Sequence, residues 1–180
     1  GYGALGANNT GAQNTAVGRE SLLANTGGND NTAVGSSALA TVATGVSNTA
    51  IGKSALQANT GGSNVAVGKS ALAANTTASN NIAVGSSAAA ANTTGTRNTT
   101  IGFEAYAASD TENDNIAIGY AAMTTNTAGG TRNVAIGNYA LDAHTSGDDN
   151  VGVGYAALGA NNTGAENTAL GNNALDANTT

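Results

Sequence analysis

Asn14-Thr15-Ala16-Val17-Gly18 is the first complete copy of a pentad that recurs along the whole chain. Each later copy begins 16, 17 or 18 residues after the one before it, and 17 is the usual spacing. The copies begin at Asn14, Asn31, Asn48, Asn64, Asn81, Asn98, Asn115, Asn133, Asn150 and Asn167. A period this regular indicates a repeat architecture, so we expect residues 1–180 to form a single repeat array. Because the chain begins and ends inside a repeat, we expect it to be a piece of a longer array.

The composition excludes several classes of function. The net charge is −6, only 3% of the residues are aromatic, and Pro and Cys are absent. An acidic chain is a poor partner for nucleic acid, because phosphate binding needs clustered Lys and Arg. Without Cys there is no disulfide framework, and no apolar run approaches the roughly 18 residues of a membrane span. The large apolar residues recur at the same positions of each repeat. A disordered chain does not require such regularity, so the pattern favours a folded structure.

We number the Asn of each pentad as repeat position 1, which gives the consensus N-T-A-V-G-x-x-A-L-x-A-N-T-x-G-x-x. This unit is too short for a two-helix repeat or a propeller blade. The β-branched residues at positions 2 and 4 predict a short strand with one buried face, which the Gly at position 5 ends. A second short strand is expected around the Leu of position 9, followed by a polar turn.

Each repeat is therefore expected to be one coil of an all-β parallel β-solenoid with two short strands per coil. Stacked coils lie about 4.8 Å apart, so the rod would be roughly 50 Å long. The repeats that begin at Asn48 and Asn115 are one residue shorter and one residue longer than the others, and both changes fall in the polar turn. The pattern leaves the handedness of the coil open.

In a solenoid, residues at the same repeat position stack in a column. The Asn column of position 1 predicts a structural ladder of side-chain amides. Position 3 is Ala in all copies except Thr100 and Gly152, and position 8 is Ala except for Ser21. Such small residues are expected where another surface packs closely. For position 3 this surface is either a partner subunit or the opposite wall of the same coil.

The charged residues are sparse but ordered. The basic residues fall at position 6 or at the last position of the repeat, directly before the next Asn. At this last position the sign of the charge alternates along Arg97, Asp114, Arg132 and Asp149. We predict an exposed ion-pair ladder there, in which each contact contributes about 0.2–1 kcal/mol.

Position 6 supplies the candidate contact surface. Besides Arg19, Lys53 and Lys69, it carries four aromatic residues, which are Tyr2, Phe103, Tyr120 and Tyr155. Exposed aromatic residues next to cations are typical of binding surfaces. The alternative is that these side chains lie over the edge of the coil and shield its backbone.

Other chemistry is scarce. The turn 110–114 contains three acidic residues that could hold a hard cation such as Ca²⁺, but it lacks the spacing of an EF-hand loop, and a solvated acidic turn is favoured. His144 is the only His and is expected to be exposed in a polar turn, with no sign of a catalytic triad. We therefore predict no enzymatic activity, no metal site and no cofactor.

Asn75 and Asn92 lie in Asn-x-Thr triplets that could accept N-glycans.

The pentads, such as Asn-Thr-Ala-Val-Gly at Asn14 and Asn-Ile-Ala-Val-Gly at Asn81, resemble the head repeats of trimeric autotransporter adhesins. They are also similar to repeat arrays of phage tail fibres and related bacterial surface proteins. The resemblance covers all ten repeats, and it implies a left-handed parallel β-roll that assembles as a homotrimer. The period is longer than that of the adhesin family, and the sequence shows no stalk, neck or membrane anchor.

These observations predict a structural rod that is extracellular, on a cell surface or on a virion fibre. Many identical coils would present one weak contact repeatedly to a host-surface or matrix ligand, which raises avidity without a deep pocket. We expect a homo-oligomer, either a trimer or a filament. The main alternative is a subunit of a self-assembling cell-surface filament. An ice-binding solenoid is less favoured, because position 2 is Thr in only five of the ten copies and there is no Thr-x-Thr row.

Overall fold

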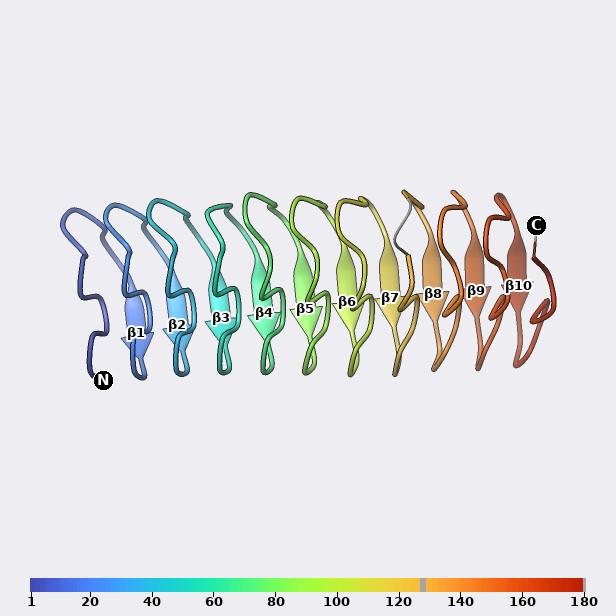
Figure 1. Ribbon diagram of the computed structural model, residues 1–180, viewed down its shortest axis with the longest axis horizontal. Helices are drawn as coiled ribbons and strands as arrows, with labels where there is room; N and C mark the ends of the chain where they lie inside the picture. The colour runs from blue at the N-terminus through green and yellow to red at the C-terminus, as the bar shows by residue number, and fades with distance from the viewer. Residues whose placement is uncertain (127–128, 180) are drawn as a thin grey trace.

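The computed structural model describes residues 1–126 and 129–179. These residues form a straight rod of stacked coils with the two chain ends at opposite ends (Figure 1). Ten strands form one sheet in the order of the chain, and all neighbouring strands are parallel. The strands are β1 (Thr15–Val17), β2 (Thr32–Val34), β3 (Thr49–Ile51), β4 (Val65–Val67), β5 (Ile82–Val84), β6 (Thr99–Ile101), β7 (Ile116–Ile118), β8 (Val134–Ile136), β9 (Val151–Val153) and β10 (Thr168–Leu170). The predicted all-β parallel solenoid is confirmed. Left-handedness stays a prediction.

The register of the sheet follows the repeat. Residues at the same repeat position are partners in every neighbouring pair of strands, as Thr32 and Thr49 are. The short repeat keeps this register, with Thr49 beside Val65, and so does the long one, with Ile116 beside Val134. The one-residue changes in repeat length therefore leave the sheet undisturbed. Part of the turn of the long repeat, residues 127–128, lies outside the described residues.

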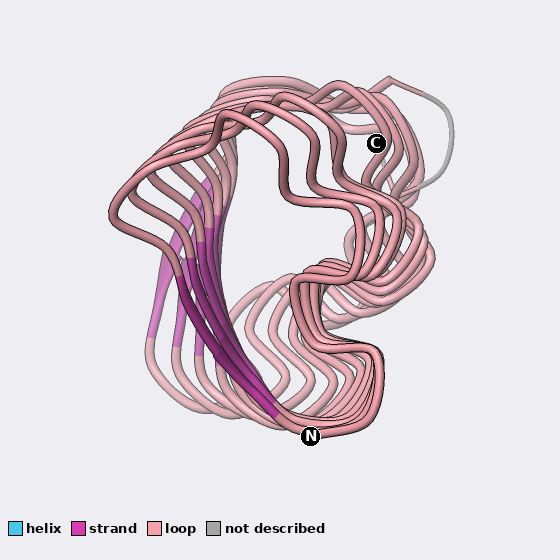
Figure 2. Ribbon diagram, turned by 90° about the vertical axis from the view of Figure 1, so that its left-hand side faces the viewer, coloured by secondary structure: helices cyan, strands magenta, loops and turns pink. Residues whose placement is uncertain are grey.

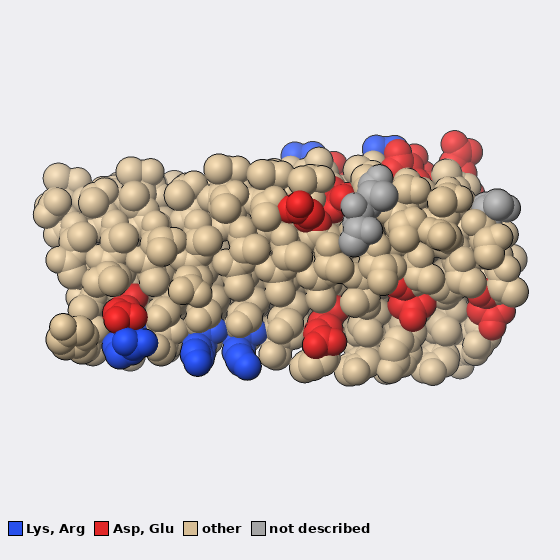
Figure 3. Space-filling model, in the orientation of Figure 1, with Lys and Arg blue, Asp and Glu red and all other residues tan. Residues whose placement is uncertain are grey.

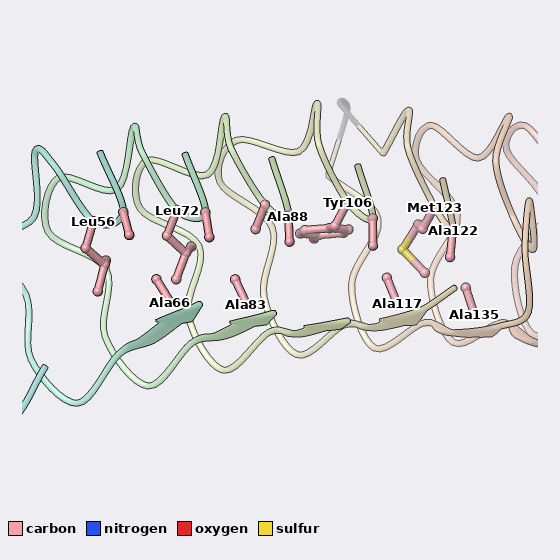
Figure 4. Close-up of a cluster of buried hydrophobic side chains, with 14 of the residues drawn as sticks. Leu56, Ala66, Leu72, Ala83, Ala88, Tyr106, Ala117, Ala122, Met123 and Ala135 are labelled. Atoms are coloured by element: carbon pink, nitrogen blue, oxygen red, sulfur yellow. The ribbon is translucent and has the colours of Figure 1, made fainter. Parts of the chain in front are cut away.

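The strands bury the face opposite to the one that the sequence predicts. Ala33, Ala50 and Ala66 at position 3 are fully buried, whereas the β-branched residues at positions 2 and 4 are half-buried or exposed in every strand. The prediction of a buried β-branched face is wrong. Figure 4 shows why: the Ala side chains of the strands point toward the Leu side chains of the opposite wall across a narrow interior. Position 3 thus packs inside its own coil and does not face a partner.

The second wall of the coil, positions 6–11, is not a strand, which corrects the prediction of two strands per coil (Figure 2). Ser37 and Leu39, at positions 7 and 9, have φ of 58° and 49°, and the other coils repeat this pattern. A left-handed residue breaks the alternation of a strand, in which successive side chains point to opposite faces. As a result Ala38 and Leu39 are adjacent in sequence and both fully buried. Backbone hydrogen bonds between coils, such as Leu39 N–H to Ala55 O at 3.0 Å, hold this wall together.

The core is a single row of large side chains from position 9, packed against the Ala columns. Leu56, Leu72 and Met123 lie along this row in Figure 4. Tyr106 replaces Leu in its coil and is fully buried, next to a coil in which Ala89 occupies the same position. The long side chain therefore follows a short one in the column, which fits the close packing of protein interiors. The Tyr106 hydroxyl lies 2.6 Å from Asn115 Nδ2 and accepts its hydrogen bond.

Candidate contact surfaces

The Asn column of position 1 lies in the interior beside the sheet. Asn48 Oδ1 accepts a hydrogen bond from the Asn64 backbone N–H at 3.0 Å, so the side chain of one coil binds the backbone of the next. Asn48 Nδ2 donates to Asn31 Oδ1 at 3.2 Å and to Gly61 O at 2.9 Å. Similar bonds recur at the other pentads, so these buried amides connect neighbouring coils and the two ends of one coil. Within the column the bonds run to neighbouring amides and to backbone groups, so its role is structural; only Nδ2 of Asn167, in the last coil, lacks a partner among the described residues.

A second inner column at position 12 was not singled out from the sequence. Asn25 Oδ1 accepts from the Gly28 N–H at 3.0 Å, and its Nδ2 donates to Gly28 O at 3.1 Å, so one side chain closes the polar turn. The signal was the Asn-Thr-x-Gly spacing, which was interpreted only as a turn. Asn75 and Asn92 belong to this column and are fully buried. A glycan could therefore reach either of them only before the coil forms.

His144 takes the place of Asn in this column, and it is fully buried, so the prediction of an exposed His is wrong. Its Nε2 lies 2.7 Å from Gly147 O, and its Nδ1 lies 3.2 Å from Asn161 O. The ring replaces the amide as the group that closes the turn. Because it is enclosed by backbone carbonyls, it is not available as a general base for a substrate.

We expect His144 to make the rod less stable as the pH falls. Burial lowers its pKa in the folded chain, whereas an unfolded His titrates near about 6.5. The unfolded chain therefore takes up the proton first, so the stability is complete above about pH 6.5 and is lost as the pH falls toward the folded pKa. His144→Asn, which restores the consensus residue, should reduce this loss in thermal melts followed by circular dichroism between about pH 7 and pH 5.

The ion pairs are a control for this measurement. Hydrogen bonds from Arg97 and Arg132 lower the pKa of Asp114 and Asp149, respectively. Stability from these carboxylates is therefore lost only below about pH 4, outside the range of His144. If the stability of the His144→Asn chain depended on pH in the same way as that of the wild-type chain, the loss of stability could not be assigned to His144.

The ladder predicted along the last position of the repeat consists of two separate bidentate pairs. Arg97 binds Asp114 through Nε at 2.5 Å and Nη2 at 2.8 Å. Arg132 binds Asp149 through Nε at 2.7 Å and Nη2 at 2.8 Å, and it also reaches Asp148 at 3.2 Å. Among the described residues no ion pair joins Asp114 to Arg132. These groups are exposed to solvent, which screens their charges, so the pairs contribute little to stability and mainly favour correct register.

The acidic turn 110–114 does not gather its carboxylates around one point. Glu112 is 3% exposed, and its carboxylate accepts hydrogen bonds from the backbone N–H groups of Asp110 at 2.9 Å and Gly129 at 3.1 Å. The expectation of a fully solvated turn is therefore wrong for Glu112. Asp110 accepts from the Thr93 hydroxyl, while Asp114 belongs to the ion pair with Arg97. Within residues 1–126 and 129–179, no three His, Asp or Glu side chains could hold a metal ion together.

The exposed aromatic residues of the C-terminal half form one continuous row across four successive coils. Phe103 stacks on Tyr120 with ring centroids 5.5 Å apart and planes at 8°. Tyr139 makes edge contacts with Tyr120 at 5.3 Å and with Tyr155 at 5.8 Å. The four rings remain 36–50% exposed, so they both support one another and face the solvent. We call Phe103, Tyr120, Tyr139 and Tyr155 the aromatic row.

Tyr139 was missed from the sequence because it stands at position 7, while the other three rings stand at position 6. Asn138 holds position 6 in that coil, and its Oδ1 accepts the Tyr120 N–H at 2.9 Å. Tyr2 was predicted to share the surface. It is 85% exposed and lies at the far N-terminal end, with none of the described rings in contact with it.

The edge of the rod that carries position 6 differs in its side chains between the N-terminal and C-terminal halves. Arg19, Lys53 and Lys69 stand at position 6 in coils nearer the N-terminus. Figure 3 shows Lys and Arg gathered along the lower edge of the rod toward the N-terminal end and acidic side chains along that edge toward the C-terminal end. Arg19 is paired with Glu20 at 2.9 Å. The edge therefore has a cationic segment and a separate aromatic, acidic one.

No pocket opens anywhere in the part of the chain that the structure describes. No family model, curated protein or solved structure matches this chain. Among the described residues there is also no helix long and apolar enough to cross a membrane. The candidate surfaces are thus the aromatic row and the outer face of the sheet, both of which are open and extended.

Proposed function

We propose that this chain belongs to a rigid extracellular rod, of the adhesin-head or tail-fibre kind, that displays weak contact surfaces at a fixed spacing. The observation that carries the proposal is the aromatic row, in which four half-exposed rings stand on consecutive coils of a regular scaffold. Tyr and other aromatic residues are enriched among the side chains that dominate binding energy at interfaces. A rigid scaffold holds such rings in place before a ligand arrives, which lowers the entropic cost of binding.

The absence of a pocket among the described residues favours a macromolecular ligand that lies along the rod. Small molecules are usually bound in concave sites that bury most of their surface. A shallow row of rings gives a weak contact, so useful affinity has to come from many copies acting together. Linked weak contacts can raise the apparent affinity by about 10²- to 10⁴-fold. Enzymatic activity forms no part of the proposal, since the single His of the chain is enclosed in a structural turn.

The proposal predicts that binding depends on the aromatic row and on multivalency. We expect beads that carry many copies of the chain to bind arrays of immobilised matrix proteins and surface polysaccharides, while single chains bind weakly or not at all. The double substitution Tyr120→Ala and Tyr155→Ala should weaken bead binding by about tenfold or more, because exposed Tyr anchors often contribute more than about 1 kcal/mol each.

Tyr2→Ala is the matched control, since Tyr2 has the same residue type and repeat position but lies outside the aromatic row. It should leave bead binding unchanged. Equal binding by the wild-type chain and the double variant would contradict the assignment of the row as a contact surface. Electron microscopy of the isolated chain tests the alternative, because open end-to-end growth supports a self-assembling filament.

A further inference from the structure

Three of the four rings in the aromatic row are phenols, and they contact one another. Tyr139 lies between Tyr120 and Tyr155, with ring centroids 5.3 Å and 5.8 Å away. Each of the three stands on its own coil, and the three coils are consecutive. The other two Tyr residues of the chain are Tyr2, which is 85% exposed, and Tyr106, which is fully buried. The three surface phenols that contact one another are thus placed where a bond between them would join neighbouring coils.

The reactive parts of these phenols lie close together. The planes of Tyr120 and Tyr139 meet at 67°, so the edge of one ring points toward the other ring. Desolvation, and after it the neighbouring phenol of Tyr120, raises the pKa of Tyr139 above its usual value. The second effect requires the two hydroxyl groups to be near each other. The ring carbons beside these hydroxyls, the ortho carbons, are therefore near each other as well.

We propose that Tyr139 is a site of oxidative coupling, which joins it mainly to Tyr120 on the preceding coil and to a lesser extent to Tyr155 on the following one. The oxidant is hydrogen peroxide, used by a haem peroxidase. Each phenol loses one electron and one proton, and the two phenoxyl radicals combine through an ortho carbon of each ring. Both carbons then release their hydrogen as a proton while both oxygens take one up, which restores the phenols. In total, one peroxide is reduced to two waters and two tyrosines become one dityrosine.

The rigid scaffold favours coupling within one chain. Carbon atoms in contact are about 3.5–4.0 Å apart and bonded ones about 1.5 Å, so the rings must approach by roughly 2 Å. Tyr120 and Tyr139 are 43% and 36% exposed, which leaves them accessible to a small oxidant, and exposed side chains reorient within nanoseconds. A partner on the same chain is present at an effective concentration of about millimolar or more. Coupling within the chain therefore exceeds coupling between chains in dilute solution.

The product would be a covalent link between adjacent coils. Each coil of a solenoid contacts only its neighbours, so a bond between two of them prevents the stack from opening at that point. The chain contains no Cys and cannot form a disulfide for this purpose. A carbon–carbon bond between two rings also survives reducing conditions, which a disulfide does not.

The test treats the purified chain with hydrogen peroxide and a haem peroxidase. The band with the mass of a single chain is isolated from a denaturing gel and digested with trypsin, which cleaves after Lys and Arg. Cleavage after Arg97 and Arg132 places Tyr120 in peptide 98–132, and Tyr139 with Tyr155 in peptide 133–180. We expect mass spectrometry to find these two peptides joined, with the loss of two hydrogen atoms from the sum of their masses. A link between Tyr139 and Tyr155 would instead remove two hydrogen atoms from peptide 133–180 alone.

Two variants identify the residue. Tyr139→Phe keeps the ring but removes the phenol, and it should lower the yield of joined peptides by about tenfold or more, because Tyr120 loses its neighbouring partner. Tyr2→Phe is the matched control, since none of the described rings contacts Tyr2, and it should leave the yield unchanged.

A comparison that needs no variant tests the role of the fold. The wild-type chain oxidised in denaturant should give far fewer joined peptides than the folded chain. Equal yields from the folded and the denatured chain would overturn the proposal, and so would coupling that occurs only between chains or an undiminished yield from Tyr139→Phe. The bead assay uses chains that have not been oxidised, so the contact function and the coupling can fail independently.

Discussion

Replacing Gly102 with Ala is expected to destabilise the rod by more than about 4 kcal/mol, or to prevent folding, because two backbones meet at this position. Gly102 has φ of 142°, and a Cβ there would lie 2.1 Å from the carbonyl oxygen of Gly119 in the next coil. The neighbouring coil cannot move away without breaking the sheet beside it. Each coil of a solenoid is stabilised by contact with its two neighbours. A steric clash in a central coil therefore also destabilises the adjacent coils. Thermal unfolding followed by circular dichroism measures the effect.

Gly129→Ala separates the steric contribution from the conformational one. Gly129 also has a positive φ, of 107°, but a Cβ there meets nothing within 4 Å. It should therefore show only the cost of an unfavourable backbone conformation, about 1–3 kcal/mol. If both substitutions lowered the stability equally, close approach of the coils would not be the reason for the Gly at position 5.

Replacing Asn48 with Leu is expected to lower the stability by about 2–4 kcal/mol, although Leu is apolar and similar in size. The change leaves the buried backbone N–H of Asn64 without its acceptor, and an unsatisfied buried group costs about 1–3 kcal/mol. It also removes one of the two donors to the Gly61 carbonyl, which keeps its bond from Asn59 Nδ2. The same substitution also breaks the amide contact with Asn31. Chemical denaturation with a common denaturant gives the difference in the free energy of unfolding.

Two further substitutions identify the hydrogen bond as the cause. Asn48→Asp keeps the shape and the acceptor but replaces the amide donor with an oxygen that faces Gly61 O, so we expect it to be strongly destabilising as well. Asn9→Ala removes an exposed Asn and should change the stability by less than about 0.5 kcal/mol. If Asn48→Leu were tolerated as well as Asn9→Ala, the Asn column would not be required for stacking.

The repeat period was enough to predict the solenoid, because seventeen residues and a short β-branched segment leave few other architectures. The orientation of the strand was not predictable by the usual pattern. Bulky β-branched residues normally face a core, and the alternation alone does not show that the Ala between them takes the inner face instead. Here the coil is so narrow that Ala50 fills the space between the strand and Leu56, and the larger side chains have to point outward.

The second wall was missed for a different reason. Left-handed backbone conformations are rare for residues other than Gly, Asn and Asp. A Leu such as Leu39 in this conformation is therefore not predicted by any sequence pattern. For His144 and Glu112, the column of Asn or Gly in which each stands was visible, but burial of a charged or titratable residue in a turn is uncommon enough to be rejected. The aromatic row was partly predicted. Tyr139 joins it because a ring one residue further along the chain still reaches its neighbours on the adjacent coils.

The hydrogen bonds between coils, such as Leu39 N–H to Ala55 O, join each coil to the next along the length of the rod. A force that stretches the molecule end to end therefore pulls directly on these bonds, and one coil can be released while the rest stay stacked. A released coil of 17 residues extends to about 58 Å from an original rise of about 4.8 Å. Under tension the rod would lengthen in equal steps and act as an extensible tether that absorbs mechanical load.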